Sequence, residues 1–152
     1  MNNEPDTRGN ESPRVPPRRD GGQSSRVGYI IAIIVNVILL WVANNLLAWN
    51  VPFLTSDFVA VLGVLNISIG ANIIANILWF FYDAAWFRHL LQIILNILAM
   101  VVIYTFYVVF PLDIGPDIVR LVLRIAMIAM LIGLGIATII ELIRLIRPQV
   151  ER

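Results

Sequence analysis

The chain has 152 residues, of which 59% are hydrophobic, and its mean hydropathy is +0.84. These values lie far above those of an ordinary globular domain, and a net charge of only +1 gives no electrostatic basis for nucleic acid as a partner. The chain has no cysteine and a single histidine, His89, which excludes disulfides, thiolate chemistry and a histidine-based metal cluster within one chain.

The N-terminal segment differs in composition from everything that follows. Residues 1–26 contain four prolines together with Gly, Ser, Asn and mixed charge, so they cannot bury enough apolar surface to offset their ordering entropy. We therefore expect a disordered cytoplasmic tail over 1–26, a transmembrane domain over 27–147 and a short cytoplasmic tail over 148–152. The first apolar run is too long for a signal-peptide core, which favours an uncleaved signal anchor.

Four apolar runs follow the tail, and each approaches or exceeds the roughly 20 residues needed to cross a bilayer. Ser56 or Asp57 is suited to cap the second helix, Pro116 favours the first position of the fourth, and Pro148 is expected to end it. Because every link is short, sequential helices should pack as antiparallel neighbours, which predicts an all-α, integral membrane antiparallel four-helix bundle. The expected spans are 27–49, 57–82, 87–110 and 117–146.

The distribution of arginine predicts the orientation. In a four-span chain, nine of the eleven basic residues, all of them Arg, fall on the side of the two termini. The positive-inside rule then places both termini in the cytoplasm of a multi-pass cell-membrane protein. Trp49 and Phe53 suit the outer interface, and Trp79, Tyr82 and Trp86 suit the inner one.

The two halves of the chain align when one is shifted by 60 residues, so that Asn36 falls on Asn96 and Asp57 on Asp117. Pro52 falls near Pro111, one residue out of step. One interpretation is two tandem αα-hairpin repeats in the same orientation, as in some transporters. The other is coincidence combined with the common pattern of capped membrane hairpins, and the sequence leaves both open.

Several amide and hydroxyl side chains lie inside the apolar runs. An amide without a partner in hydrocarbon is costly, so these side chains should face the bundle interior or an oligomer interface. We favour interhelical hydrogen bonding, and the alternative is a hydrated path or ion site. The predicted interhelical polar residues are Asn36, Ser68, Asn72, Asn76, Gln92 and Asn96.

The fourth run contains charges and small residues as well. Arg120 and Arg124 share one helix face, where they can snorkel to headgroups or pair with Asp113 and Asp117, or else form an anion or lipid-headgroup site. Glu141 and Arg144 have the spacing of an ion pair. A helix-packing stripe of small residues is predicted on another face. Its members are Ala126, Ala129, Gly133 and Ala137.

No constellation typical of catalysis is present, and we expect no enzyme activity, cofactor or metal site. His89 is interpreted as an interfacial residue or a proton-sensitive switch. The leading hypothesis is a non-catalytic structural or accessory protein, a subunit or assembly factor that docks helices in a membrane complex or homo-oligomer. The alternative is a small oligomeric channel or transporter with Asn-lined helix faces. Expected partners are the lipid bilayer and either another membrane protein or further copies of the chain.

Overall fold

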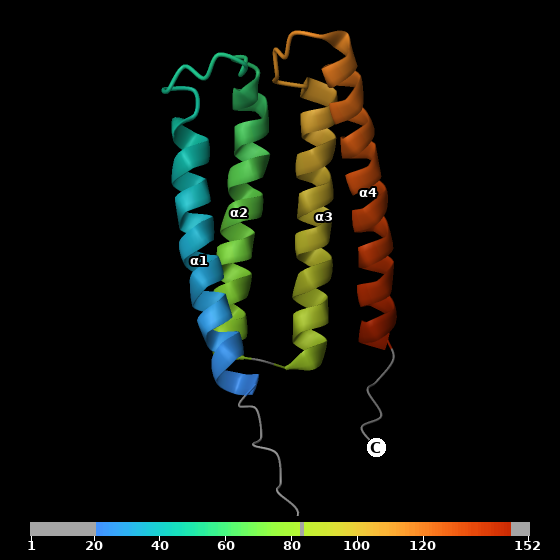
Figure 1. Ribbon diagram of the computed structural model, residues 1–152. Coiled ribbons are helices and arrows are strands. Elements are labelled where there is room, and N and C mark those ends of the chain that lie inside the picture. Colours follow the sequence, from blue (N-terminus) through green and yellow to red (C-terminus); the bar gives the residue numbers. More distant parts are fainter. Residues whose placement is uncertain (1–20, 83, 147–152) are drawn as a thin grey trace, which may run out of the picture.

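The computed structural model describes residues 21–82 and 84–146, which form four long helices (Figure 1). No strand occurs among these residues, so the all-α prediction is confirmed. Every helix contains a stretch that is long and apolar enough to cross a membrane. The helices are α1 (Gly21–Asn45), α2 (Phe58–Phe81), α3 (Ala85–Val109) and α4 (Asp117–Ile146).

The observed helix boundaries are close to the expected ones. Helix α4 begins and ends as predicted, whereas α1 begins at Gly21, inside the segment expected to be a tail. Once the apolar part of a helix is formed, adding a few residues to its end needs no new nucleation, which explains the earlier start. Asp57 occupies the N-cap of α2 but makes no side-chain capping bond. The predicted tail over 1–20 and the stop at Pro148 lie outside the described residues.

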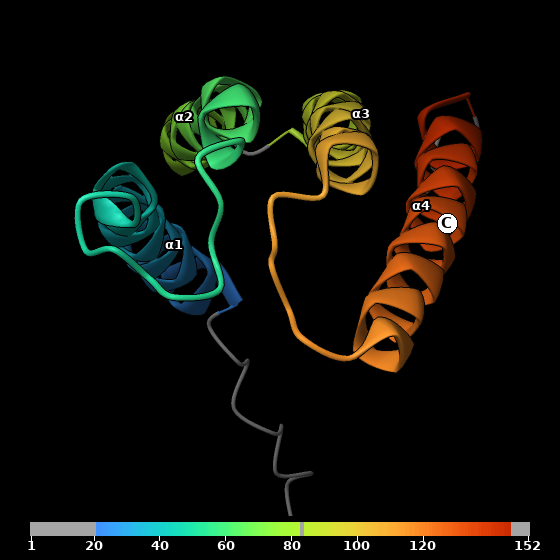
Figure 2. The ribbon, with the colours of Figure 1, turned by 90° about the horizontal axis from the view of Figure 1, so that it is seen from above.

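The helices run alternately up and down, with two links at one end and the third link at the end of the termini (Figure 1). Consecutive helices pack against each other, as the short links predict. Within the described helices, however, α1 and α4 do not contact each other. Seen from above, the helices stand in an open arc with α1 and α4 at its two ends (Figure 2). In a single chain, therefore, only consecutive helices pack together, and the bundle topology stays a prediction.

The α1–α2 and α3–α4 links are joined by a short antiparallel bridge between Leu54 and Leu112. Each link supplies one backbone donor and one acceptor. The Thr55 amide donates to the Pro111 carbonyl at 2.9 Å, and the Asp113 amide donates to the Phe53 carbonyl at 2.9 Å. The bridge fastens the two hairpins to each other at what we call the loop end of the molecule.

The backbone repeats one unusual conformation at the offset seen in the sequence. Asn50 follows α1 with φ of 48°, and Phe110 follows α3 with φ of 44°. These residues are 60 positions apart, as are Asp57 and Asp117 at the starts of α2 and α4. The two links therefore share a left-handed residue and a following aspartate at one offset but differ in length, and α1 and α4 lack the contact that α2 and α3 make.

Buried side chains form two clusters along α2 and its neighbours. At the loop end, Phe58 lies 6.1 Å from the ring of Phe106, and Pro111 is fully buried. Nearer the termini, Ala75, Trp79 and Leu95 form a second cluster. Trp79, which we expected at the inner interface, is only 9% exposed, and its depth in the membrane stays a prediction. It packs against α1 and α3 because its helix is central in the arc.

Candidate functional site

A polar cavity of the described structure lies at the loop end. Its volume is about 310 Å³, and three segments of the chain contribute to it: the α1–α2 link, the end of α3 with the link that follows, and the first turns of α4. The lining residues are Thr55, Val109, Phe110, Leu112, Asp113, Arg120 and Arg124. We call this cavity the loop-end pocket.

Both arginines of the pocket rest against aromatic rings of α3 and its end. The guanidinium carbon of Arg124 lies 5.1 Å from the ring centre of Phe110 and 5.8 Å from that of Tyr107. The guanidinium carbon of Arg120 lies 6.0 Å from the centre of the same Phe110 ring. Such contacts stabilise the cations through the ring quadrupole and leave their N–H donors available.

The arginines have no carboxylate partner among the described residues. The ion pairs of α4 involve Glu141 near its other end, so the alternative that Arg120 and Arg124 pair with Asp113 and Asp117 is not observed, and contact with headgroups stays a prediction. The reason is geometric: Asp113 is held by the bridge, and its side chain lies on the pocket wall beyond ion-pair distance of either guanidinium.

Two of the lining residues each have one buried side-chain atom without a hydrogen-bond partner. These atoms are Nε of Arg120 and Oγ1 of Thr55. A buried donor without an acceptor is costly, so unsatisfied groups of this kind are uncommon in folded proteins. Thr55 was not identified from the sequence, because only the bridge between the links brings it to α4.

The predicted interhelical amides are observed to bond within their own helices. The side-chain amides of Asn36, Asn72 and Asn76 donate to the carbonyls of Ala32, Ser68 and Asn72 at 2.8, 2.9 and 2.7 Å. Gln92 donates to Asn96 of the same helix at 3.0 Å. Ser68, Asn76 and Asn96 are nevertheless buried, at 8%, 7% and 7% exposure. A role for this set between helices stays a prediction.

A different pair of amides joins two helices. Asn44 of α1 donates to Oδ1 of Asn66 at 2.9 Å, and Asn66 of α2 donates back to Oδ1 of Asn44 at 3.0 Å. The two residues are 22 positions apart, so no spacing rule relates them in the sequence. This reciprocal pair satisfies donor and acceptor of both amides in one contact.

A second polar contact joins α3 to α4 near the termini. His89 Nδ1 lies 2.6 Å from Oε2 of Glu141, and both side chains are mostly buried. Arg144 donates to the other carboxylate oxygen at 3.2 Å, which confirms the predicted ion pair. The sequence indicated both Glu141 and His89 as polar residues but gave no sign that they meet.

The small-residue stripe of α4 is not covered by the chain itself. Ala126, Ala129 and Gly133 are exposed and Ala137 is half-buried. A Cβ added at Gly133 would meet nothing within 4 Å. Close packing at this stripe therefore requires a helix from outside the single chain, and its packing role stays a prediction.

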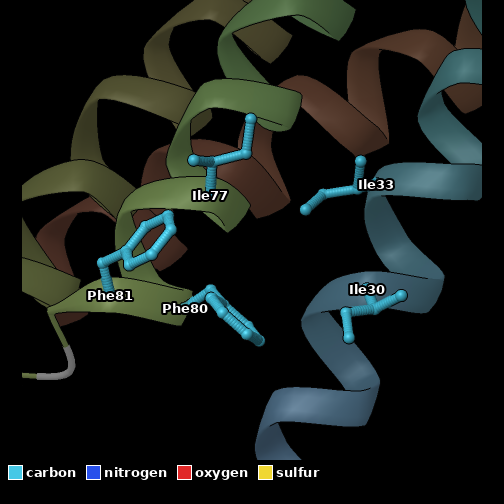
Figure 3. A pocket seen from close by; sticks show the side chains of 5 residues that line it. All are labelled: Ile30, Ile33, Ile77, Phe80 and Phe81. Carbon is cyan, nitrogen blue, oxygen red and sulfur yellow. The ribbon is translucent and has the colours of Figure 1, made fainter.

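An apolar pocket of about 220 Å³ opens between α1 and α2. Figure 3 shows the lining side chains, Ile30 and Ile33 on α1 and Ile77, Phe80 and Phe81 on α2, with Phe80 extending toward Ile30. Side chains of this kind offer no hydrogen bond, so a hydrocarbon chain fits this pocket and a polar ligand does not.

The described residues contain no group of three or more His, Asp or Glu side chains that could hold a metal ion. Comparison of the chain with protein-family models, curated proteins and solved structures finds no match.

Proposed function

We propose that this chain is a non-catalytic structural protein of the cell membrane whose open side, between α1 and α4, docks helices of a second copy. The observation that carries this proposal is the missing contact between α1 and α4. Only 6% of each of these two spans is buried, compared with 22% of the α2 span. Lipid alone can cover a long apolar helix, so the missing contact does not by itself indicate a protein neighbour.

The repeated hairpin plan supports a second copy as that neighbour. If the first hairpin corresponds to the second, α1 corresponds to α3 and α4 corresponds to α2. The contact of α2 with α3 inside one chain then has a counterpart between α4 of one copy and α1 of the next. Two copies in the same orientation would make this contact twice, which is a closed twofold arrangement.

The small-residue stripe of α4 supports close approach by another helix. Association in lipid depends on van der Waals packing, which small residues favour because they let two backbones come near each other. Gly133 lies at the middle of the stripe with open space around it. A leucine at this position would fill that space without disturbing the fold of the single chain.

Gly133→Leu is therefore the central test, and Gly63→Leu is its matched control because Gly63 is also exposed with nothing near its added Cβ. Native mass spectrometry of the full chain from a mild detergent should give a dimer or larger assembly for the wild type and for the control. Gly133→Leu should shift the population towards monomer, and the stability of the folded chain should not change. A monomeric wild type, or one different protein bound in fixed ratio, would overturn the second copy as the occupant.

We further infer that both termini face the cytoplasm, because most arginines lie on their side of the four spans. The chain has no cysteine, so single-cysteine variants need no background changes. In intact cells, Ser56→Cys should react with a membrane-impermeant maleimide and Gln149→Cys should not. The opposite pattern would reverse the orientation, and equal labelling of both would contradict a four-span topology.

A further inference from the structure

The loop-end pocket has the chemistry of a site for an anionic group with several oxygens. Its volume of about 310 Å³ is roughly ten times the space of one water molecule. Two arginines face it without an ion pair in the described part of the chain, and a single carboxylate, Asp113, shares the wall. The local charge is therefore positive.

The two unsatisfied atoms indicate where such a group would bind. Nε of Arg120 is buried and lacks an acceptor, and the guanidinium presents its N–H donors as a planar fork that matches two oxygens of a phosphate. Oγ1 of Thr55 lines the same pocket, is equally buried and unpartnered, and has a hydroxyl hydrogen to donate. One phosphate with three or more accessible oxygens would satisfy both residues and leave an oxygen for Arg124.

The position of the pocket favours a lipid as the source of the phosphate. Helix α4 has 30 residues and is about 45 Å long, which exceeds the roughly 30 Å of a bilayer's hydrocarbon core. Arg120 and Arg124 lie in its first two turns, at the loop end (Figure 1). The excess length allows those turns to sit at the depth of the headgroups, where phosphate is abundant.

We propose that the loop-end pocket binds the phosphate group of a phospholipid headgroup, with Arg120 and Thr55 as donors to the oxygens and Arg124 as the second cation. Asp113 then lies beside the phosphate, where it disfavours a dense multiply charged anion and suits a headgroup with further hydroxyl or amine donors. None of the stripe residues of α4 lines this pocket, so the variants that test the site differ from the variant that tests the proposed oligomer.

The test is calorimetric titration of the full chain in a maltoside detergent, which contains no phosphate. The probes are dihexanoyl phosphatidylglycerol, dihexanoylglycerol without phosphate, and inorganic phosphate. The proposal expects binding of the short-chain phospholipid, none of the diacylglycerol, and weaker binding of inorganic phosphate. Equal affinity for inorganic phosphate and the phospholipid would overturn the lipid source, and equal affinity for dihexanoylglycerol would overturn a phosphate site altogether.

Variants locate the binding to the pocket. Arg120→Gln should weaken phospholipid binding about 10-fold or more, because a charge-assisted bond is lost. Arg120→Lys keeps the charge without the Nε donor and should recover only part of the affinity. Thr55→Val, which is nearly isosteric, should cost about 3-fold to 10-fold. Arg144→Gln, at the other end of α4, is the control and should bind as the wild type does.

Thermal unfolding followed by circular dichroism shows whether each variant is folded. If Arg120→Gln fails to fold, Arg124→Gln and Thr55→Val carry the test, because both side chains lie on the same wall. Affinity unchanged in Thr55→Val and in the folded arginine variants would overturn the pocket as the site.

Discussion

The two hairpins of this protein share a backbone plan and differ in their side-chain chemistry. Both link regions contain a left-handed residue, Asn50 or Phe110, and lead to a helix that starts at or beside an aspartate. At the same offset, however, Arg120 of the second hairpin corresponds to Ala60 of the first, and Arg124 corresponds to Val64. The charged residues of the pocket therefore come from the second hairpin only, although both hairpins line the pocket.

The contacts inside each hairpin differ in the same way. In the first, α1 and α2 are joined by the Asn44–Asn66 amide pair. In the second, α3 and α4 are joined by His89 and Glu141 near the termini. The two links thus share a left-handed residue at the same offset, whereas each hairpin has its own polar contact. Variants that remove one contact at a time test how far the hairpins are independent.

The largest effect is expected from the charged contact of the second hairpin. Glu141→Leu removes the acceptor of His89 and leaves a partly buried imidazole without a partner. A hydrogen bond to a charged group contributes about 1.5–3 kcal/mol, so the free energy of unfolding should fall by roughly that amount. Reversible unfolding in mixed SDS micelles, followed by circular dichroism, measures it.

The control for this variant is Arg144→Gln, because Arg144 is 57% exposed and its bond to Glu141 should contribute less than about 0.5 kcal/mol. The double variant His89→Leu/Glu141→Leu should be less destabilised than Glu141→Leu alone, since both polar partners are removed together. Strict additivity of the two substitutions would show that the contact has no energetic weight.

A smaller effect is expected from the amide pair of the first hairpin. Asn44→Leu leaves the Asn66 amide unpaired beside lipid, at a cost of about 1 kcal/mol, within the range for hydrogen bonds between membrane helices. Asn44→Leu/Asn66→Leu should recover most of that loss. Thermal unfolding of the single and double variants measures this recovery. A double variant that is less stable than either single variant would contradict an isolated pair.

The link conformation gives a third comparison. Asn tolerates a positive φ better than other residues that carry a Cβ, and glycine tolerates it best. Asn50→Ala should therefore lower stability by about 1 kcal/mol, while Asn50→Gly should stay within about 0.5 kcal/mol of the wild type. Equal stability of the Ala and Gly variants in the same unfolding assay would mean that the left-handed conformation is not required.

The helices could be predicted from the sequence, and their lateral arrangement could not. Apolar length and short proline-containing links determine the spans locally, which is why the bounds of α4 agree with the prediction. A membrane helix can be apolar all round, so hydropathy does not say which faces meet, and the open side between α1 and α4 was missed. Arg120 and Arg124 follow from their spacing, but Thr55 is 65 residues from Arg120 and reaches the pocket only through the link bridge.

The smallest effect on stability is expected from the amides at the centre of α2. Asn72 and Asn76 donate to the Ser68 and Asn72 carbonyls of their own helix, and those carbonyls also accept backbone N–H groups of the helix. Replacing both with leucine removes two donors and leaves no carbonyl unsatisfied, so the loss should stay below about 1 kcal/mol. Ile74→Leu, on an exposed position of the same helix, is the control.

The same double variant separates a structural protein from a channel. In liposomes, the proposed structural role expects no robust ion flux from the wild type or from Asn72→Leu/Asn76→Leu. If the amides lined a hydrated path, leucine would make that stretch apolar and prone to dewetting, and conduction would stop while the fold survived. A strong wild-type flux that disappears in a well-folded double variant would therefore replace the docking proposal with an Asn-lined channel.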